Sequence, residues 1–179
     1  MVNVQRIRVP VGFLFGLVFL YFCRPTPYPL GAGLLVAAGG LAVRIWSTGH
    51  LEKWRRLAVR GPYRFTRNPL YFGSFLMGLG FTLASSSFIL LILFLLLFVL
   101  LYGPVMKREE KELLDQYGED YLAYRERVSR FLPGRPLPIR GHEVAPFSWK
   151  RVWENREYNA ILGYFIVSLF LCWKSPWPF

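Results

Sequence analysis

Five apolar stretches interrupt the chain and leave little room for any architecture other than a set of helices in a membrane. They lie at residues 9–23, 30–43, 70–84, 88–102 and 160–173. A membrane-spanning helix needs about 20 mostly apolar residues, which each stretch reaches only with its flanking aromatic, Ser or Arg side chains. Together they cover more of a 179-residue chain than its own core could bury. The sequence therefore predicts an all-α, polytopic integral membrane protein with about five transmembrane helices.

The distribution of charge supports this prediction and orients the helices. If each stretch crosses once, all of the 22 Lys and Arg residues except Arg24 and Lys174 fall on one side, together with all 11 acidic residues. The positive-inside rule makes that side cytoplasmic, with the N-terminus inside and the C-terminus on the opposite side. Nucleic-acid binding, the other common interpretation of a net charge of +11, is disfavoured, and anionic lipid headgroups become the expected partners.

Cysteine and histidine are too few and too scattered to indicate a metal site or a disulfide framework. Cys23 and Cys172 each lie at the end of an apolar stretch, and no short spacing joins them to His50 or His142. We expect the two thiols to behave as small buried hydrophobic groups and expect no metal ligands.

The polar segment at residues 51–73 carries the first group of candidate binding residues. Pro69 is suited to the first turn of the third apolar helix, with Asn68 near its N-cap. A helix N-terminus offers unpaired backbone N–H groups and partial positive charge, which with Arg67 would hold a carboxylate or a phosphate. The alternative is a basic interfacial loop whose aromatic residues, such as Tyr71, contact lipid headgroups.

A second polar segment follows the fourth apolar stretch. Residues 104–117 are predicted to form a separate helix that begins near Pro104 and is closed by Gly118. Glu110 lies in the middle of the apolar face of this helix, and Glu109 lies at its edge. A carboxylate in an apolar face is costly without a partner, so Glu110 indicates either an ion pair with a nearby Arg or a ligand site.

A further short amphipathic helix is predicted after Gly118. Tyr121, Tyr124, Val128 and Phe131 would line one face of it, and Pro133 would terminate it. Taken by itself, this stripe indicates packing rather than ligand binding.

Two motifs in this order resemble one family. GPYRFTRNPLYFG, then an apolar hairpin and REEKELLDQYGEDYLAYRERVSRFLP, is similar to the integral-membrane methyltransferases related to isoprenylcysteine carboxyl methyltransferase and the phospholipid methyltransferases. The residues that match the family pattern are Arg67, Asn68, Pro69, Tyr71, Gly73, Glu109, Glu110, Gly118, Tyr121, Tyr124 and Pro133. The resemblance covers about residues 30–133, so residues 1–179 form one methyltransferase-like domain in which residues 134–179 are a C-terminal extension with the fifth span.

The resemblance implies a membrane-embedded methyltransferase with its active site at the cytoplasmic face. Its methyl donor would be S-adenosylmethionine, and a lipid-like acceptor would enter from the bilayer. The implied cofactor-binding residues are Arg67, Asn68, Pro69, Tyr71, Glu109, Glu110, Tyr121 and Tyr124. The acceptor would be a prenylcysteine-type or other lipid carboxylate, or a phospholipid amine.

One position departs from the family pattern, which usually has His where this chain has Asn68. Asn keeps its hydrogen-bonding capacity but cannot exchange a proton near neutral pH. This departure favours an acceptor that is already deprotonated, or else a loss of activity.

Arg44 and a Gly-x-Gly pattern each leave two interpretations open. Arg44 follows the second apolar stretch, where it either snorkels to the interface or recognises the acceptor. Gly78 and Gly80 resemble a cofactor element of the phospholipid branch, although close helix packing is the preferred explanation.

Two other classes of function remain as rivals. The first is a nicotinamide-dependent membrane reductase that shares the helical core. The second is a non-catalytic membrane scaffold, in which Asn68 would mark lost activity, and the chain is also a possible homo-oligomer.

Overall fold

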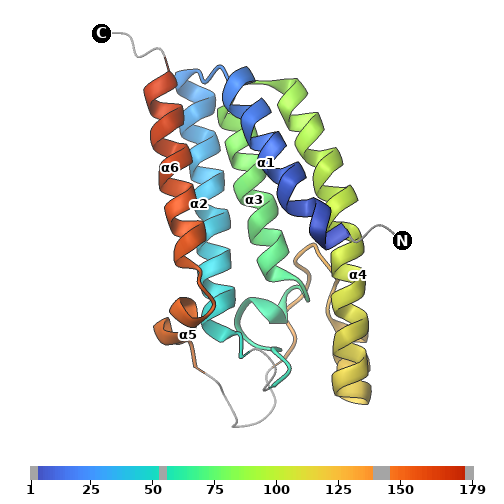
Figure 1. Cartoon of the computed structure of the whole chain (residues 1–179). Coiled ribbons are helices and arrows are strands. Elements are labelled where there is room, and N and C mark those ends of the chain that lie inside the picture. The colour runs from blue at the N-terminus through green and yellow to red at the C-terminus, as the bar shows by residue number, and fades with distance from the viewer. Residues whose placement is uncertain (1–3, 53–55, 139–145, 176–179) are drawn as a thin grey trace.

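The computed structural model of the chain describes residues 4–52, 56–138 and 146–175. Within these ranges the regular secondary structure is helical, which confirms the all-α prediction. The helices are α1 (Val4–Phe22), α2 (Pro27–His50), the short 3₁₀ helix η1 (Gly61–Arg64), α3 (Pro69–Ala84), α4 (Phe88–Arg127), α5 (Trp149–Glu154) and α6 (Tyr158–Lys174). Helices α1, α2, α3, α4 and α6 run along one another as a bundle (Figure 1).

The lengths of these helices bear on the prediction of five spans. Among the described residues, α2 and α4 are long and apolar enough to cross a membrane, while Pro10–Phe22, α3 and α6 are shorter apolar helices. At 1.5 Å per residue, a 16-residue helix such as α3 is about 24 Å long, less than the ~30 Å of a bilayer core. The crossing of all five helices therefore stays a prediction.

Glycines bring α2 and α3 into backbone contact along an interface that we call the α2–α3 seam. A Cβ atom added to Gly33 would overlap the Ala84 amide nitrogen and the Gly80 carbonyl oxygen, and one added to Gly80 would overlap Ala37. Gly78 instead lies against an aromatic ring of α4. The packing interpretation of Gly78 and Gly80 is therefore confirmed, since small residues let helix backbones approach closely.

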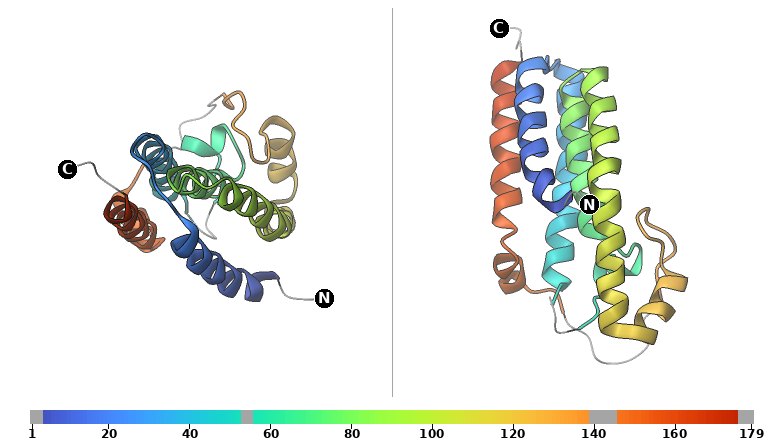
Figure 2. Two further views of the ribbon diagram at one scale, coloured as in Figure 1. Left: turned by 90° about the horizontal axis from the view of Figure 1, so that it is seen from above. Right: turned by 45° about the vertical axis from the view of Figure 1, so that its right-hand side comes forward.

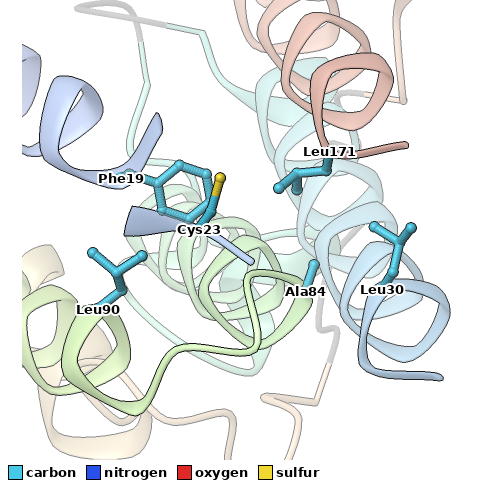
Figure 3. Packing of buried hydrophobic residues seen from close by; sticks show 6 residues of the cluster. All are labelled: Phe19, Cys23, Leu30, Ala84, Leu90 and Leu171. Carbon is cyan, nitrogen blue, oxygen red and sulfur yellow. The ribbon is translucent and has the colours of Figure 1, made fainter. Parts of the chain in front are cut away.

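At the end of the bundle that holds the C-terminal end of α6, short connections join the helices and an apolar cluster packs between them (Figure 1). Figure 3 shows this cluster, which consists of Phe19, Cys23, Leu30, Ala84, Leu90 and Leu171. A tight turn joins α3 to α4, and its Ser85 carbonyl accepts a 2.9 Å hydrogen bond from the Arg24 amide. Cys23 is buried and Cys172 half-buried, both as free thiols.

Helix α4 carries the chain beyond the bundle. Its straight part, residues 88–117, would span about 45 Å, about half as long again as the thickness of a bilayer core. The prediction of a separate helix starting near Pro104 is wrong, because α4 continues through Pro104 without a break. The predicted break at Gly118 is confirmed, since φ is +51° there and the helix changes direction (Figure 2).

The last part of the predicted amphipathic helix has a different structure. The helix ends at Arg127 and Val128 is extended, so Phe131 does not share a helix face with Tyr121 and Tyr124. The cause is tertiary, because the chain after Val128 returns to the bundle and the Ser129 carbonyl accepts a 2.9 Å hydrogen bond from the Arg67 amide. The Phe131 ring packs at 5.6 to 5.8 Å from the rings of three bundle residues, Phe72, Phe75 and Phe98.

Candidate functional site

A cavity of about 500 Å³ lies where the loop after α2, the start of α3 and the second half of α4 meet. We call this end of the bundle the polar end; it also holds α5, and the C-terminal end of α6 lies opposite to it (Figure 1). The cavity is lined by Arg44, Leu51, Glu52, Arg56, Leu57, Ala58, Tyr63, Arg67, Asn68, Pro69, Leu70, Tyr71, Glu109, Glu112, Leu113, Gln116, Tyr117 and Tyr124. Its volume is within the range of about 300–1,000 Å³ that is usual for small-molecule sites.

The start of α3 forms one wall of the cavity. Pro69 is the first residue of α3 and Asn68 is its N-cap, as predicted. The Asn68 side chain does not cap the helix, however; its Nδ2 donates a 2.9 Å hydrogen bond to the carbonyl oxygen of Arg130. Asn68 therefore ties the chain after α4 to the start of α3.

Glu110 is held by two arginines behind the cavity wall. Its Oε1 lies 2.8 Å from Arg67 Nη1, and its Oε2 lies 2.5 Å from Arg130 Nη2. Arg130 Nε donates a further 3.0 Å hydrogen bond to Oε1. Of the two alternatives for Glu110, the structure shows the ion pair, which satisfies the buried carboxylate in the manner that its desolvation requires.

Arg67 has one unused donor. Its side chain is only 9% exposed, yet it lines the cavity, and its Nε has no hydrogen-bond partner in the described part of the chain. Its Nη1 is already engaged by Glu110 and lies 3.3 Å from the Tyr121 hydroxyl oxygen, to which it donates. A buried donor without an acceptor is costly, so the site favours a ligand that brings an acceptor atom to Arg67.

Tyr71 and Glu109 form a second polar pair on the cavity wall. The Tyr71 hydroxyl donates a 2.5 Å hydrogen bond to Glu109 Oε1, which joins α3 to α4. The Tyr71 ring also packs edge-on against the Tyr102 ring, with the centroids 5.5 Å apart. The Glu109 carboxylate is thereby held in a fixed position on the cavity wall.

The tyrosines at the site stay protonated. Burial raises the pKa of Tyr63 and of Tyr124, and it also raises the pKa of Tyr121, although the hydrogen bond from Arg67 opposes that shift. The Tyr124 hydroxyl donates a 2.7 Å hydrogen bond to the Tyr63 carbonyl oxygen. The hydrogen bond to Glu110 raises the pKa of Arg130, so the Arg130 guanidinium stays charged. These hydroxyls consequently serve as neutral hydrogen-bonding groups rather than as bases.

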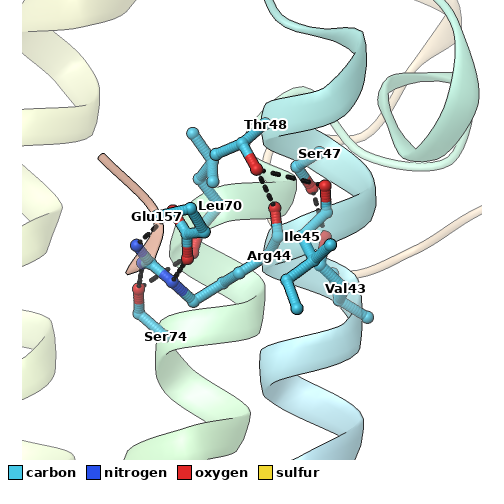
Figure 4. Close-up of polar contacts among 8 residues, drawn as sticks. All are labelled: Val43, Arg44, Ile45, Ser47, Thr48, Leu70, Ser74 and Glu157. Atoms are coloured by element: carbon cyan, nitrogen blue, oxygen red, sulfur yellow. Dashed lines mark hydrogen bonds and ion pairs between the residues drawn. The ribbon is translucent and has the colours of Figure 1, made fainter. Parts of the chain in front are cut away.

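Arg44 lines the cavity, but its guanidinium is held inside the bundle. Its Nε and Nη2 donate to the two carboxylate oxygens of Glu157 at 2.6 and 3.1 Å, and Nη1 donates to Ser74 Oγ at 2.5 Å (Figure 4). The charge of Arg44 is therefore neutralised by a buried carboxylate next to the start of α6, and snorkelling and acceptor recognition both stay predictions.

The structure brings six of the eight predicted cofactor-binding residues to one cavity. These are Arg67, Asn68, Pro69, Tyr71, Glu109 and Tyr124. Glu110 and Tyr121 lie behind Arg67 and contact it instead. Arg130 and Glu157, which complete the ion pairs, were not predicted from the sequence. Neither belongs to a recognisable motif, and the charge of each was the only signal that it could serve as a partner.

A comparison with models of known families places this site in a familiar context. The model of the phospholipid methyltransferases matches residues 30–120, half of the chain. The chain belongs to this family. Membership implies methyltransferase activity in a membrane setting and confirms the resemblance. No curated protein and no solved structure matches the chain at the significance that we required.

Proposed function

We propose that this phospholipid methyltransferase family member transfers a methyl group from S-adenosylmethionine to a lipophilic acceptor in the cavity at the polar end. The observation that carries the proposal is the state of Arg67. It is a buried cation with an unused donor on the wall of a cavity of suitable size, beside a helix N-terminus.

The chemistry of the lining residues fits this cofactor. Its methionine end carries a carboxylate and an ammonium group. Arg67 and the N-terminus of α3 would hold the carboxylate, and Glu109, which Tyr71 keeps in place, would hold the ammonium or the ribose hydroxyls. When bound, S-adenosylmethionine supplies an electrophilic methyl group on a positively charged sulfur. The ring faces of Tyr71 and Tyr124 are suited to lie near such a cation.

Glu110 and Tyr121, two of the residues expected to contact the cofactor, are now proposed to act through Arg67. Glu110 binds Arg67 Nη1, and Arg67 Nε is left without a partner among the described residues. Because methyl transfer is an in-line displacement, correct placement of the reactants and exclusion of water account for much of the catalysis. Both residues would contribute by fixing Arg67.

The acceptor is proposed to be one that needs no base at its methyl-accepting atom. Asn68 cannot accept a proton, and the pKa values of Tyr63 and Tyr124 are raised, so neither tyrosine is ionised near neutral pH. Glu109 accepts a hydrogen bond from Tyr71. A lipid carboxylate attacks as the anion, whereas a protonated amine would first have to lose a proton.

The polar end is proposed to face the cytoplasm, with the acceptor entering from the bilayer. Two features support this: most of the described Lys and Arg residues belong to segments at that end (Figure 1), and the cavity begins where the apolar helices end. The same basic segments would hold anionic lipid headgroups.

Calorimetry in detergent tests the cofactor. We expect S-adenosylhomocysteine to bind the wild-type protein and NADPH not to bind. The Arg67→Gln variant should lose affinity for S-adenosylhomocysteine by about 100-fold, because a charge-assisted contact to the ligand is removed. Arg125→Gln, a change at an exposed residue that does not line the cavity, is the matched control.

Two results would reject the proposal. Binding of NADPH without any response to S-adenosylhomocysteine would indicate a reductase. Binding of S-adenosylhomocysteine without methyl transfer from labelled S-adenosylmethionine to lipid carboxylates or phospholipid amines would indicate a non-catalytic scaffold.

A further inference from the structure

We propose that residues 146–157, which we call the brace, position two charged residues of the cavity and thereby the bound cofactor. The two cavity residues are Arg44 and Glu52, and each is paired with a brace residue of opposite charge. Glu157 and Arg151 are then positioning residues. This inference rests on the proposed function, because it concerns the same cavity.

Glu157 binds Arg44 in the geometry of a strong ion pair. Both carboxylate oxygens accept from the guanidinium, at 2.6 and 3.1 Å, and Glu157 is only 3% exposed. Its backbone is fixed too, since the Glu157 amide donates a 3.1 Å hydrogen bond to the Val152 carbonyl oxygen and Glu157 occupies the N-cap position of α6. A two-pronged contact from a rigid support sets the direction of the guanidinium.

Arg151 binds Glu52 on the other side of the brace. Its Nη2 lies 2.6 Å from Glu52 Oε1, and both side chains are largely buried. Its Nη1 donates to the carbonyl oxygens of Gly49 at 3.0 Å and Pro146 at 2.6 Å. Arg151 therefore joins the cavity residue Glu52 to the last turn of α2.

The brace also satisfies the C-terminal end of α2. Asn155 Nδ2 donates to the carbonyl oxygens of Thr48 and Leu51 at 3.2 and 3.3 Å, and the Ser148 amide donates to that of Gly49 at 3.0 Å. The last carbonyls of a helix have no partner within it, so a segment that supplies donors holds the helix end in place. The end of α2 and the brace thus form one unit.

The position of the brace in the chain makes it an addition to the matched core. The family model ends at residue 120, and the brace begins 26 residues later. The brace nonetheless orients two charged residues of the cavity, Arg44 on α2 and Glu52 just after it. We infer that the C-terminal extension of this protein serves the cofactor site, and that α6 anchors the brace to the bundle through Glu157.

The test is the affinity for S-adenosylhomocysteine, measured by calorimetry on the full chain. Glu157→Gln keeps the size of the side chain and removes its charge, and we expect a roughly tenfold loss of affinity. Glu154→Gln is the matched control, because Glu154 is in the same segment and forms only an exposed, 3.8 Å pair with Lys150. That control should bind as the wild type does.

A double-mutant cycle separates positioning from general destabilisation. If Glu157 acts through Arg44, then adding Glu157→Gln to Arg44→Gln should change the affinity no further. Two results would overturn the inference. One is that the two substitutions cause independent, additive losses of affinity; the other is that Glu157→Gln lowers only the melting temperature and leaves the affinity unchanged.

A second variant covers the case in which Glu157→Gln does not yield folded protein. Arg151→Gln then replaces it, with the same expected loss of affinity and the same overturning result. A wild-type protein that binds no S-adenosylhomocysteine would reject the proposed function itself. If the wild-type protein binds S-adenosylhomocysteine and both variants keep the full affinity, the proposal for the brace alone is rejected.

Discussion

The two faces of α3 are packed in opposite ways. Toward α2, glycines let backbone meet backbone along the α2–α3 seam. Toward α4, the contact is made by large rings: Phe75 lies 5.9 Å from Phe94 and 5.1 Å from Phe98, measured between ring centroids. Backbone contact permits very little adjustment, whereas rings can change rotamer and distance.

This difference explains where the cavity lies. Along the seam there is no space between the helices, so α2 and α3 together form a rigid platform that carries Arg44 and the start of α3. On the other face the rings separate α4 from α3, and nearer the polar end the contact between these helices is the hydrogen bond from Tyr71 to Glu109. The close packing of α2 against α3 fixes one wall of the cavity, and the looser packing of α3 against α4 leaves room for a ligand.

The largest expected effect is at Glu110, on the α4 side. Glu110→Ala should abolish binding of S-adenosylhomocysteine while the protein still folds in detergent, at a cost of about 3 kcal/mol in stability. The reason is that Arg67 and Arg130 lose their shared partner. Calorimetry and thermal unfolding measure both quantities, with the exposed Glu119→Ala as control. Unchanged affinity in Glu110→Ala would show that Arg67 does not need this support.

A smaller effect is expected in the seam. Gly33→Ala should cost about 2 kcal/mol of unfolding free energy, because the added methyl group meets backbone atoms that cannot move aside. Gly39→Ala on the same helix is the control, since its added methyl group has nothing within 4 Å. That control should be neutral or slightly stabilising. Equal stability of the two variants would contradict the rigid seam.

A still smaller effect is expected among the rings. Phe75→Leu should cost about 1 kcal/mol, since aromatic pairs are lost but the apolar volume is largely kept. Phe88→Leu, at a residue that is 74% exposed on α4, should cost less. Thermal unfolding in detergent compares them, and a larger loss in Phe75→Leu than in Gly33→Ala would reverse the comparison between the two faces.

The smallest effect is expected at Asn68. Asn68→His should preserve or raise the affinity for S-adenosylhomocysteine, because a ring nitrogen of His also donates to the Arg130 carbonyl oxygen that Asn68 contacts now. The measurement is the same calorimetric titration. A large loss of affinity would show that the pocket around the start of α3 is built differently from that of relatives with His.

Local signals predicted much of the polar end correctly. The start of α3 at Pro69, the break at Gly118 and the need of Glu110 for a partner were all recognised, because each depends on a residue and its near neighbours. The end of α4 was placed wrongly, since the return of the chain past Val128 depends on contacts with residues 66–67. Periodicity alone carries no information about such contacts.

The sequence by itself determined that the chain is helical and that the family's two motifs are present, and it predicts that the charges lie on one side of the apolar segments. Only the tertiary structure decided which charges meet. Glu157 reaches Arg44 across 113 positions of sequence, and Arg130 reaches Glu110 across 20. Many Lys and Arg residues could neutralise a carboxylate equally well in water, and only the fold brings Arg44 within reach of Glu157 and both Arg67 and Arg130 within reach of Glu110.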